Sequence, residues 1–211
     1  MSDKIRSSIE VVLGIVLVFG YLWLIYPLYS LWIKILGIMP VLLFFTYSDF
    51  IKNRNLKAMG LRFDNWRDSS KILIIFTVLA IPLLYLVWQS FFPVNHFFYK
   101  YSSFWKKLFT YPFWALFQQY IFLVFFFRRY RTIFAPRIFP AVFLSALTFA
   151  MIHVPNPPLF LLCFAGGVVW AVVYNKYPNL FTIALSQAAF GVFVSSVLLV
   201  YQVVGPNADI G

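Results

Sequence analysis

Two adjacent glutamines, a histidine and a third glutamine stand inside long apolar stretches of this chain. Gln118 and Gln119 interrupt one stretch, His153 ends the next, and Gln187 interrupts the last. An amide donates and accepts hydrogen bonds but does not take up a proton near neutral pH, whereas an imidazole does. The four residues therefore predict a site that holds polar groups by hydrogen bonding. His153 is its one member able to act as a general acid or base.

The sequence contains few residues that could bind a metal or act as a catalytic nucleophile. Cys163 is the one cysteine, which excludes an intrachain disulfide and a multi-cysteine metal site. The only histidines are His96 and His153, too few for a histidine-rich metal site. We therefore expect no metal and no cofactor. A serine or cysteine route would need Ser145 or Cys163 beside His153, and no GxSG motif accompanies either, so this route is disfavoured.

Each of these residues also has a purely structural interpretation. Glutamines within membrane spans often only link helices through hydrogen bonds. A histidine at a helix end among prolines, as His153 is, can be an interfacial cap. Gly166 and Gly167 are expected to allow close helix packing, and Cys163 to be a small apolar core residue. Both interpretations remain open at this point.

The composition is that of a membrane protein. Hydrophobic residues make up 63 % of the 211 residues and charged residues 11 %. A soluble domain is about half apolar and a quarter charged, so a soluble globule is nearly excluded. The net charge of +11 would suggest nucleic acid in a soluble protein, but in a polytopic one it indicates basic loops. We expect membrane lipids as partners and no nucleic acid.

Seven stretches are apolar enough to cross a bilayer as helices, which takes about 20 residues each. They run over residues 11–29, 31–47, 72–92, 108–127, 140–153, 159–174 and 180–204, and the fifth is short. The predicted fold is all-α: a polytopic integral membrane protein with about seven transmembrane helices around a buried polar cavity. Residues 1–211 are expected to form a single transmembrane domain.

The basic residues predict the orientation. Thirteen lysines and arginines fall on one side of the seven spans and three on the other. The first group is Lys4, Arg6, Lys52, Arg54, Lys57, Arg62, Arg67, Lys71, Arg128, Arg129, Arg131, Arg137 and Lys176, and the second is Lys100, Lys106 and Lys107. Because basic loops stay inside, the amino terminus is predicted to be cytoplasmic and the protein to lie in the cell (inner or plasma) membrane. Residues 53–71 are interpreted as an amphipathic stretch on the inner surface, with an ordinary solvated loop as the alternative.

Depth along the spans places the polar residues together. Gln118 and Gln119 lie about 15 Å from Arg128 at 1.5 Å per residue, and Gln187 lies about 12 Å from the start of its span. His153 lies about 20 Å from the inner end of the fifth span. Polar groups at these depths turn toward one another rather than toward lipid. Spans four, five and seven are therefore expected to enclose one polar cavity.

The order and spacing of these residues carry a family resemblance. Phe149 and His153 form an FxxxH motif, and Gln118 and Gln119 stand at the paired glutamates of an EExxxR motif, with Leu123 at its arginine. Gln187 stands at the histidine of an HxxxN or HxxxD motif, with Gly191 at its last position. The chain thus resembles the CAAX protease and bacteriocin-processing (CPBP, or Abi) family of intramembrane endopeptidases. The CPBP-like core is expected over residues 108–204.

The resemblance implies a catalytic arrangement that this chain carries in altered form. It implies a glutamate as general base on a water, a histidine that orients the water, and a second histidine with Asn or Asp that steadies the oxyanion. The matching positions Gln118, Gln119, His153 and Gln187 are the candidate catalytic residues. Glutamine cannot replace the base, although the amide of Gln187 can still donate to an oxyanion. Glu10 at the mouth of the first span and Asp49 just past the second are not expected to substitute.

Three functions follow as alternatives. The first is an intramembrane endopeptidase that cleaves a peptide or a lipid-modified or membrane protein within the bilayer. The second is a pseudoprotease that binds such a peptide or membrane partner without cutting it, in an immunity or maturation role. The third, a small transporter or scaffold, is disfavoured by the short chain and the absence of internal repeats.

Overall fold

The computed structural model describes residues 2–28, 30–51, 55–91, 101–154 and 156–198. Throughout these residues the regular structure is helical, with no strand, so the all-α prediction is confirmed. The α-helices are α1 (Asp3–Gly20), α2 (Leu31–Thr46), α3 (Trp66–Phe91), α4 (Tyr101–Gln119), α5 (Arg128–Phe134), α6 (Phe139–Met151), α7 (Pro157–Lys176) and α8 (Leu180–Phe193). Four π-helical segments continue helices α1, α2, α4 and α8: η1 (Tyr21–Ile25), η2 (Tyr47–Ile51), η3 (Tyr120–Phe127) and η4 (Val194–Leu198).

The helices coincide with the predicted membrane spans. In the described part of the chain, five are long and apolar enough to cross a membrane: Asp3–Ile25, Leu31–Asp49, Trp66–Val87, Phe104–Phe134 and Pro157–Lys176. Two shorter apolar helices, Phe139–Met151 and Leu180–Ser196, occupy the predicted fifth and seventh spans. The chain is therefore a multi-pass membrane protein. The predicted span ends at residues 29, 92 and 199–204 lie outside the described residues.

The chain divides into two compact units. Among the described residues, the first comprises 2–28, 30–51, 55–56, 120–154 and 156–172, and the second comprises 57–91, 101–119 and 173–198. The single domain over residues 1–211 and the CPBP-like core over residues 108–204 stay predictions.

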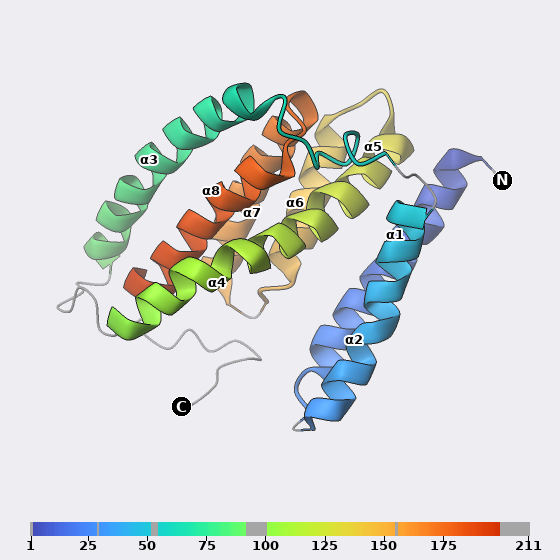
Figure 1. Cartoon of the computed structure of the whole chain (residues 1–211), viewed down its shortest axis with the longest axis horizontal. Helices are drawn as coiled ribbons and strands as arrows, with labels where there is room; N and C mark the ends of the chain where they lie inside the picture. Colours follow the sequence, from blue (N-terminus) through green and yellow to red (C-terminus); the bar gives the residue numbers. More distant parts are fainter. Residues whose placement is uncertain (1, 29, 52–54, 92–100, 155, 199–211) are drawn as a thin grey trace. The chain divides into compact units, whose positions relative to one another are not determined.

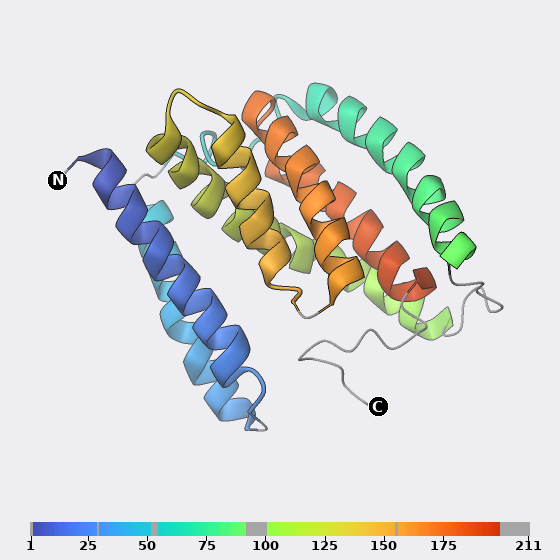
Figure 2. The ribbon, with the colours of Figure 1, turned by 180° about the vertical axis from the view of Figure 1, so that it is seen from behind.

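The first unit is built on the phenylalanine-rich segment η3. Helices α1 and α2 run side by side (Figures 1 and 2), and Phe45 of α2 meets Phe125 of η3 edge-on with ring centroids 4.3 Å apart. On α6, Phe149 stacks against Phe122 at 5.1 Å. Helix α7 lies beside α6 (Figure 2), so close at Gly167 that an added Cβ would come within 3.3 Å of a side chain of α6. Gly167 thus allows close packing, as predicted. Gly166, for which the same was predicted, instead faces a tryptophan of its own helix.

In the second unit, α8 packs against both α3 and α4 and lies between them (Figure 1). Toward α4 the contact is made by alanines: Ala115 of α4 meets Ala184 and Ala188 of α8, and all three are buried. Toward α3 the contact includes paired hydroxyls, because Ser69 and Thr182 hydrogen-bond at 2.6 Å. Small side chains bring two backbones close together, which is the usual basis of helix association in membranes.

The segment that precedes α3 is a loop anchored on the start of α8. Gly60 adopts φ +79°, a conformation that a side chain would strain, and its carbonyl accepts a hydrogen bond from the backbone N–H of Leu180 at 2.9 Å. Asn179, the N-cap of α8, donates to the carbonyl of Arg62 and to Asn65. Residues 55–65, within the stretch interpreted as amphipathic, are therefore pinned by backbone and side-chain bonds rather than arranged as a helix.

Candidate functional site

Two of the predicted site residues meet in the second unit. The side-chain nitrogen Nε2 of Gln187 on α8 donates a hydrogen bond to Oε1 of Gln118 on α4, at 2.6 Å. The alanine contact between these helices brings the two amides within reach. Because both partners are amides, the bond has no group that titrates near neutral pH. The structure thus joins two motif positions through an interhelical amide pair.

The third glutamine is buried without a partner. Gln119, the last residue of α4, is 0 % exposed, and in the described part of the chain neither its amide nitrogen nor its amide oxygen has a hydrogen-bond partner. The oxygen Oε1 of Gln187 is in the same condition. Leaving a buried polar group unpaired costs about 1–3 kcal/mol. These atoms therefore carry hydrogen-bonding capacity that the described residues do not meet.

The two remaining family positions hold residues that do not suit the family chemistry. Gly191 stands where the resemblance places Asn or Asp, and a Cβ at Gly191 would overlap the ring of Tyr111 on α4. A longer side chain at this position therefore requires the tyrosine to move. Leu123 stands where the resemblance places an arginine, and it is fully buried within the phenylalanine-rich η3.

His153 lies in the turn that follows α6. Its backbone N–H donates to the carbonyl of Ala150 at 2.9 Å, and its ring meets that of Phe149 nearly perpendicularly, with centroids 5.8 Å apart. The FxxxH spacing therefore places both motif residues on one face. His153 belongs to the first unit and the glutamines to the second, so their convergence around one cavity stays a prediction.

Within the described residues, the structure places no serine nucleophile beside His153 and no cluster of metal ligands. Ser145 is buried on α6 and precedes His153 by eight residues, or about 12 Å along a helix, too far for direct proton transfer. Across the described ranges, no three His, Cys, Asp or Glu side chains gather as a metal site would require.

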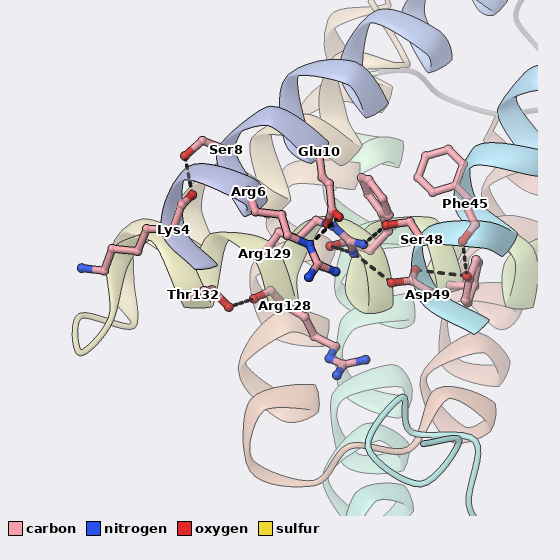
Figure 3. Close-up of polar contacts among 12 residues, drawn as sticks. Lys4, Arg6, Ser8, Glu10, Phe45, Ser48, Asp49, Arg128, Arg129 and Thr132 are labelled. Atoms are coloured by element: carbon pink, nitrogen blue, oxygen red, sulfur yellow. Dashed lines mark hydrogen bonds and ion pairs between the residues drawn. The ribbon is translucent and has the colours of Figure 1, made fainter. Parts of the chain in front are cut away.

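A charged cluster that the sequence did not suggest lies in the first unit (Figure 3). Arg129 of α5 is its centre, with a side chain 8 % exposed. Its Nε donates to Glu10 of α1 at 2.7 Å, and its Nη1 donates at 3.0 Å to Asp49 of η2, a carboxylate that is 1 % exposed. The guanidinium also donates to Ser48 and lies 3.7 Å from the ring centroid of Phe125. Three helical segments are thereby tied through one side chain.

Both acids of this cluster carry further partners. Asp49 accepts a hydrogen bond from the hydroxyl of Tyr120 at 3.0 Å, and Glu10 accepts one from Nε of Arg6 at 3.2 Å. Both carboxylates are thus already engaged by arginine or tyrosine side chains of their own cluster, which leaves their oxygens less available to a water. The expectation that neither acid replaces the missing general base therefore has a structural reason. The sequence signal was the placement of one arginine and two acids near the ends of three spans, and each was assigned separately to a loop or a span mouth.

Comparison with known proteins gives one match. The family model described as Type II CAAX prenyl endopeptidase Rce1-like matches residues 100–193, a range that includes Gln118, Gln119, His153 and Gln187. No curated protein and no solved structure matches the chain. The family model supports the resemblance drawn from the motifs.

Proposed function

We propose that this chain, a CAAX-protease-like membrane protein of the CPBP family, binds a peptide segment of a membrane or lipid-modified protein without cleaving it. The proposal rests on the buried glutamines of the second unit. Gln118 is hydrogen-bonded to Gln187, and Gln119, which follows Gln118 in sequence, has no side-chain hydrogen bond within the described residues. The main chain of a peptide supplies the alternating donors and acceptors that such amides bind.

The lack of a general base argues against hydrolysis. Five of the six acids are described: Glu10 and Asp49 bond to Arg129, while Asp3, Asp64 and Asp68 are exposed. Glutamine does not accept a proton from water near neutral pH, so none of the motif positions in span four supplies a carboxylate that could form the attacking hydroxide. His153 by itself would have to activate the water and serve the leaving group.

The altered motif positions make the loss hard to reverse. Replacing both Gln118 and Gln119 with glutamate would restore the acids only. The oxyanion position at Gly191 would still be occupied by the Tyr111 ring, and Leu123 would still offer no positive charge. The double variant Q118E/Q119E is therefore expected to remain inactive.

The cellular setting is part of the same proposal. The excess of basic residues on one side of the spans supports a cytoplasmic amino terminus and residence in the cell (inner or plasma) membrane. The partners are then membrane lipids and a peptide or lipid-modified membrane protein. Accessibility of single cysteines introduced at Ser2 and at Trp105 to a membrane-impermeant reagent, in a C163A background, tests this orientation from opposite sides.

The experiment uses the full chain in lipid nanodiscs with a fluorescent peptide that ends in a farnesylated CAAX sequence, because the matching family model is described by that substrate class. The same peptide without the farnesyl group is the second probe. We expect saturable binding by polarisation and an intact peptide by mass spectrometry, both unchanged in His153→Ala. Gln119→Leu should weaken binding. Gln89→Leu, which removes an amide already bonded to Tyr85, is the matched control.

Two results would contradict the proposal. A peptide product that forms with the natural chain and disappears in His153→Ala would establish the endopeptidase instead. Equal binding by the Gln119→Leu and Gln89→Leu variants would remove the glutamine group from the binding site.

A further inference from the structure

A polar pocket of about 300 Å³ lies beside the Arg129 cluster in the first unit. Its lining comes from the first residues of α1, the end of the α2–η2 helix and the start of α5: Asp3, Arg6, Ser7, Glu10, Asp49, Arg128, Arg129 and Thr132. The candidate peptide-binding glutamines belong to other helices, so this pocket is separate from the site described above. Nothing in the proposed function uses it.

The charges of the lining divide into a paired group and an unpaired one. Glu10 and Asp49 are matched by Arg6 and Arg129 through direct hydrogen bonds. Arg128 is half-buried, and its guanidinium makes no hydrogen bond or ion pair within the described residues; in Figure 3 it points away from the bonded atoms of the cluster. The pocket therefore offers, on α5, one guanidinium that makes no direct hydrogen bond or ion pair among the described residues and, on α1, one exposed carboxylate, Asp3.

The position of the pocket is that of a lipid head group. Helix α1 begins at Asp3, and the second candidate span ends at Asp49, so the pocket lies where two spans meet the polar layer of the bilayer. Pockets between transmembrane helices at this level that carry basic side chains can bind the phosphates of lipid head groups.

We propose that this pocket binds the phosphoethanolamine head group of a membrane phospholipid. The phosphate lies against the guanidinium of Arg128, which donates in the forked geometry that suits phosphate, and the ammonium lies against Asp3. Arg6 bonds Glu10 through Nε, and its Nη groups, which make no hydrogen bond within the described residues, add donors to the phosphate. A guanidinium and an exposed carboxylate that both line one pocket fit a zwitterion better than a simple anion.

The test is lipid titration of the full chain in detergent, followed by native mass spectrometry. The probes are phosphatidylethanolamine, phosphatidylglycerol and diacylglycerol with the same acyl chains, and soluble phosphoethanolamine and inorganic phosphate as competitors. We expect phosphatidylethanolamine to bind best and diacylglycerol not to bind at this site. The soluble competitors should displace the lipid only at concentrations at least tenfold above it, because they lack acyl chains.

Charge variants separate the two halves of the head group. Arg128→Gln should weaken phosphatidylethanolamine binding at least tenfold, whereas Arg131→Gln, an exposed arginine on the same helix outside the pocket, should leave it unchanged. Asp3→Asn should abolish the preference for phosphatidylethanolamine over phosphatidylglycerol. Its control is Asp68→Asn, another exposed acid in the first turn of a helix.

A blocking variant guards against misfolding as the cause. Ser7→Phe fills the pocket without changing charge and should remove the same adduct while the melting temperature holds. Equal binding of diacylglycerol and phosphatidylethanolamine, or equal effects of Arg128→Gln and Arg131→Gln, would overturn the proposal. So would displacement of the lipid by equimolar phosphate or phosphoethanolamine, which would make the pocket a site for a soluble ligand.

Discussion

Replacement of Arg129 by methionine should destabilise the first unit more than any other loss of a single positive charge near it. The substitution keeps the apolar stem over the Phe125 ring and removes the guanidinium. Among the described residues, it leaves Asp49, 1 % exposed, with the Tyr120 hydroxyl as its one hydrogen-bonding side-chain partner, and it leaves Glu10 with Arg6. One fully buried charge then loses its counterion.

The magnitude follows from how each acid is buried. Breaking a buried ion pair by removing one partner costs about 3–5 kcal/mol, which applies to Asp49. Glu10 is more exposed and retains Arg6 at 3.2 Å, so its loss is that of a surface pair, about 0–1 kcal/mol. We expect a destabilisation on the order of 4 kcal/mol for Arg129→Met. The double variant R129M/D49L removes both charges and should recover most of this loss, because an apolar pair of similar volume replaces a buried ion pair at little cost.

The assay is reversible unfolding of the full chain in bicelles, followed by steric trapping on the first unit. Arg131→Met is the matched control, since this arginine of the same helix is exposed and lies outside the lining of the polar pocket. It should change the free energy of unfolding by no more than about 0.5 kcal/mol, as surface substitutions do. Similar losses in the two variants, or a double variant less stable than Arg129→Met, would refute the reasoning.

Three further predictions concern the second unit. Gly60→Ala should lower the free energy of unfolding by about 1–2 kcal/mol, because φ at Gly60 is +79°. Gly20→Ala is the control and should be neutral or stabilising, because an added Cβ there meets nothing within 4 Å. Equal effects of the two substitutions would contradict the argument from backbone conformation. Gln187→Leu should cost about 1 kcal/mol through the lost amide bond, by the same assay, and no loss would show that the bond is not formed in the membrane. Arg62 hydrogen-bonds Asp64 and lowers the pKa of that carboxyl, so Arg62→Gln should raise it toward 3.8 in an NMR titration. The charged carboxylate is the bonded form, so any stability from this pair is present above the ordinary pKa and is lost as pH falls through the lowered one; an unchanged titration in Arg62→Gln would contradict this.

The positions of the helices could be predicted from the sequence because a membrane span is marked by a continuous run of apolar residues. Runs of apolar residues must be helical in a bilayer, where every backbone N–H and C=O needs a partner within its own segment. The predicted stretch at residues 31–47 corresponds to the candidate span Leu31–Asp49, and that at residues 159–174 lies within α7. The short fifth stretch is a short helix, α6, for the same reason.

The polar contacts could not be predicted at the same level because they depend on which helices become neighbours. The hydrogen bond between the amides of Gln118 and Gln187 requires the alanine contact between α4 and α8. The apolar periodicity of either helix does not indicate which helix will be its neighbour. Arg129 and Glu10 are separated by 119 residues, and the sequence placed each at a separate helix end. The clash at Gly191 with Tyr111 likewise appears only when α4 and α8 are packed.

The most direct test of the central claim is mass spectrometry of the farnesylated CAAX peptide after prolonged incubation with an equimolar amount of the full chain in nanodiscs, with binding followed in the same sample. We expect the peptide to be bound and recovered intact, with the natural chain and with Q118E/Q119E alike. A new peptide terminus that appears with the natural chain and is absent in His153→Ala would contradict it.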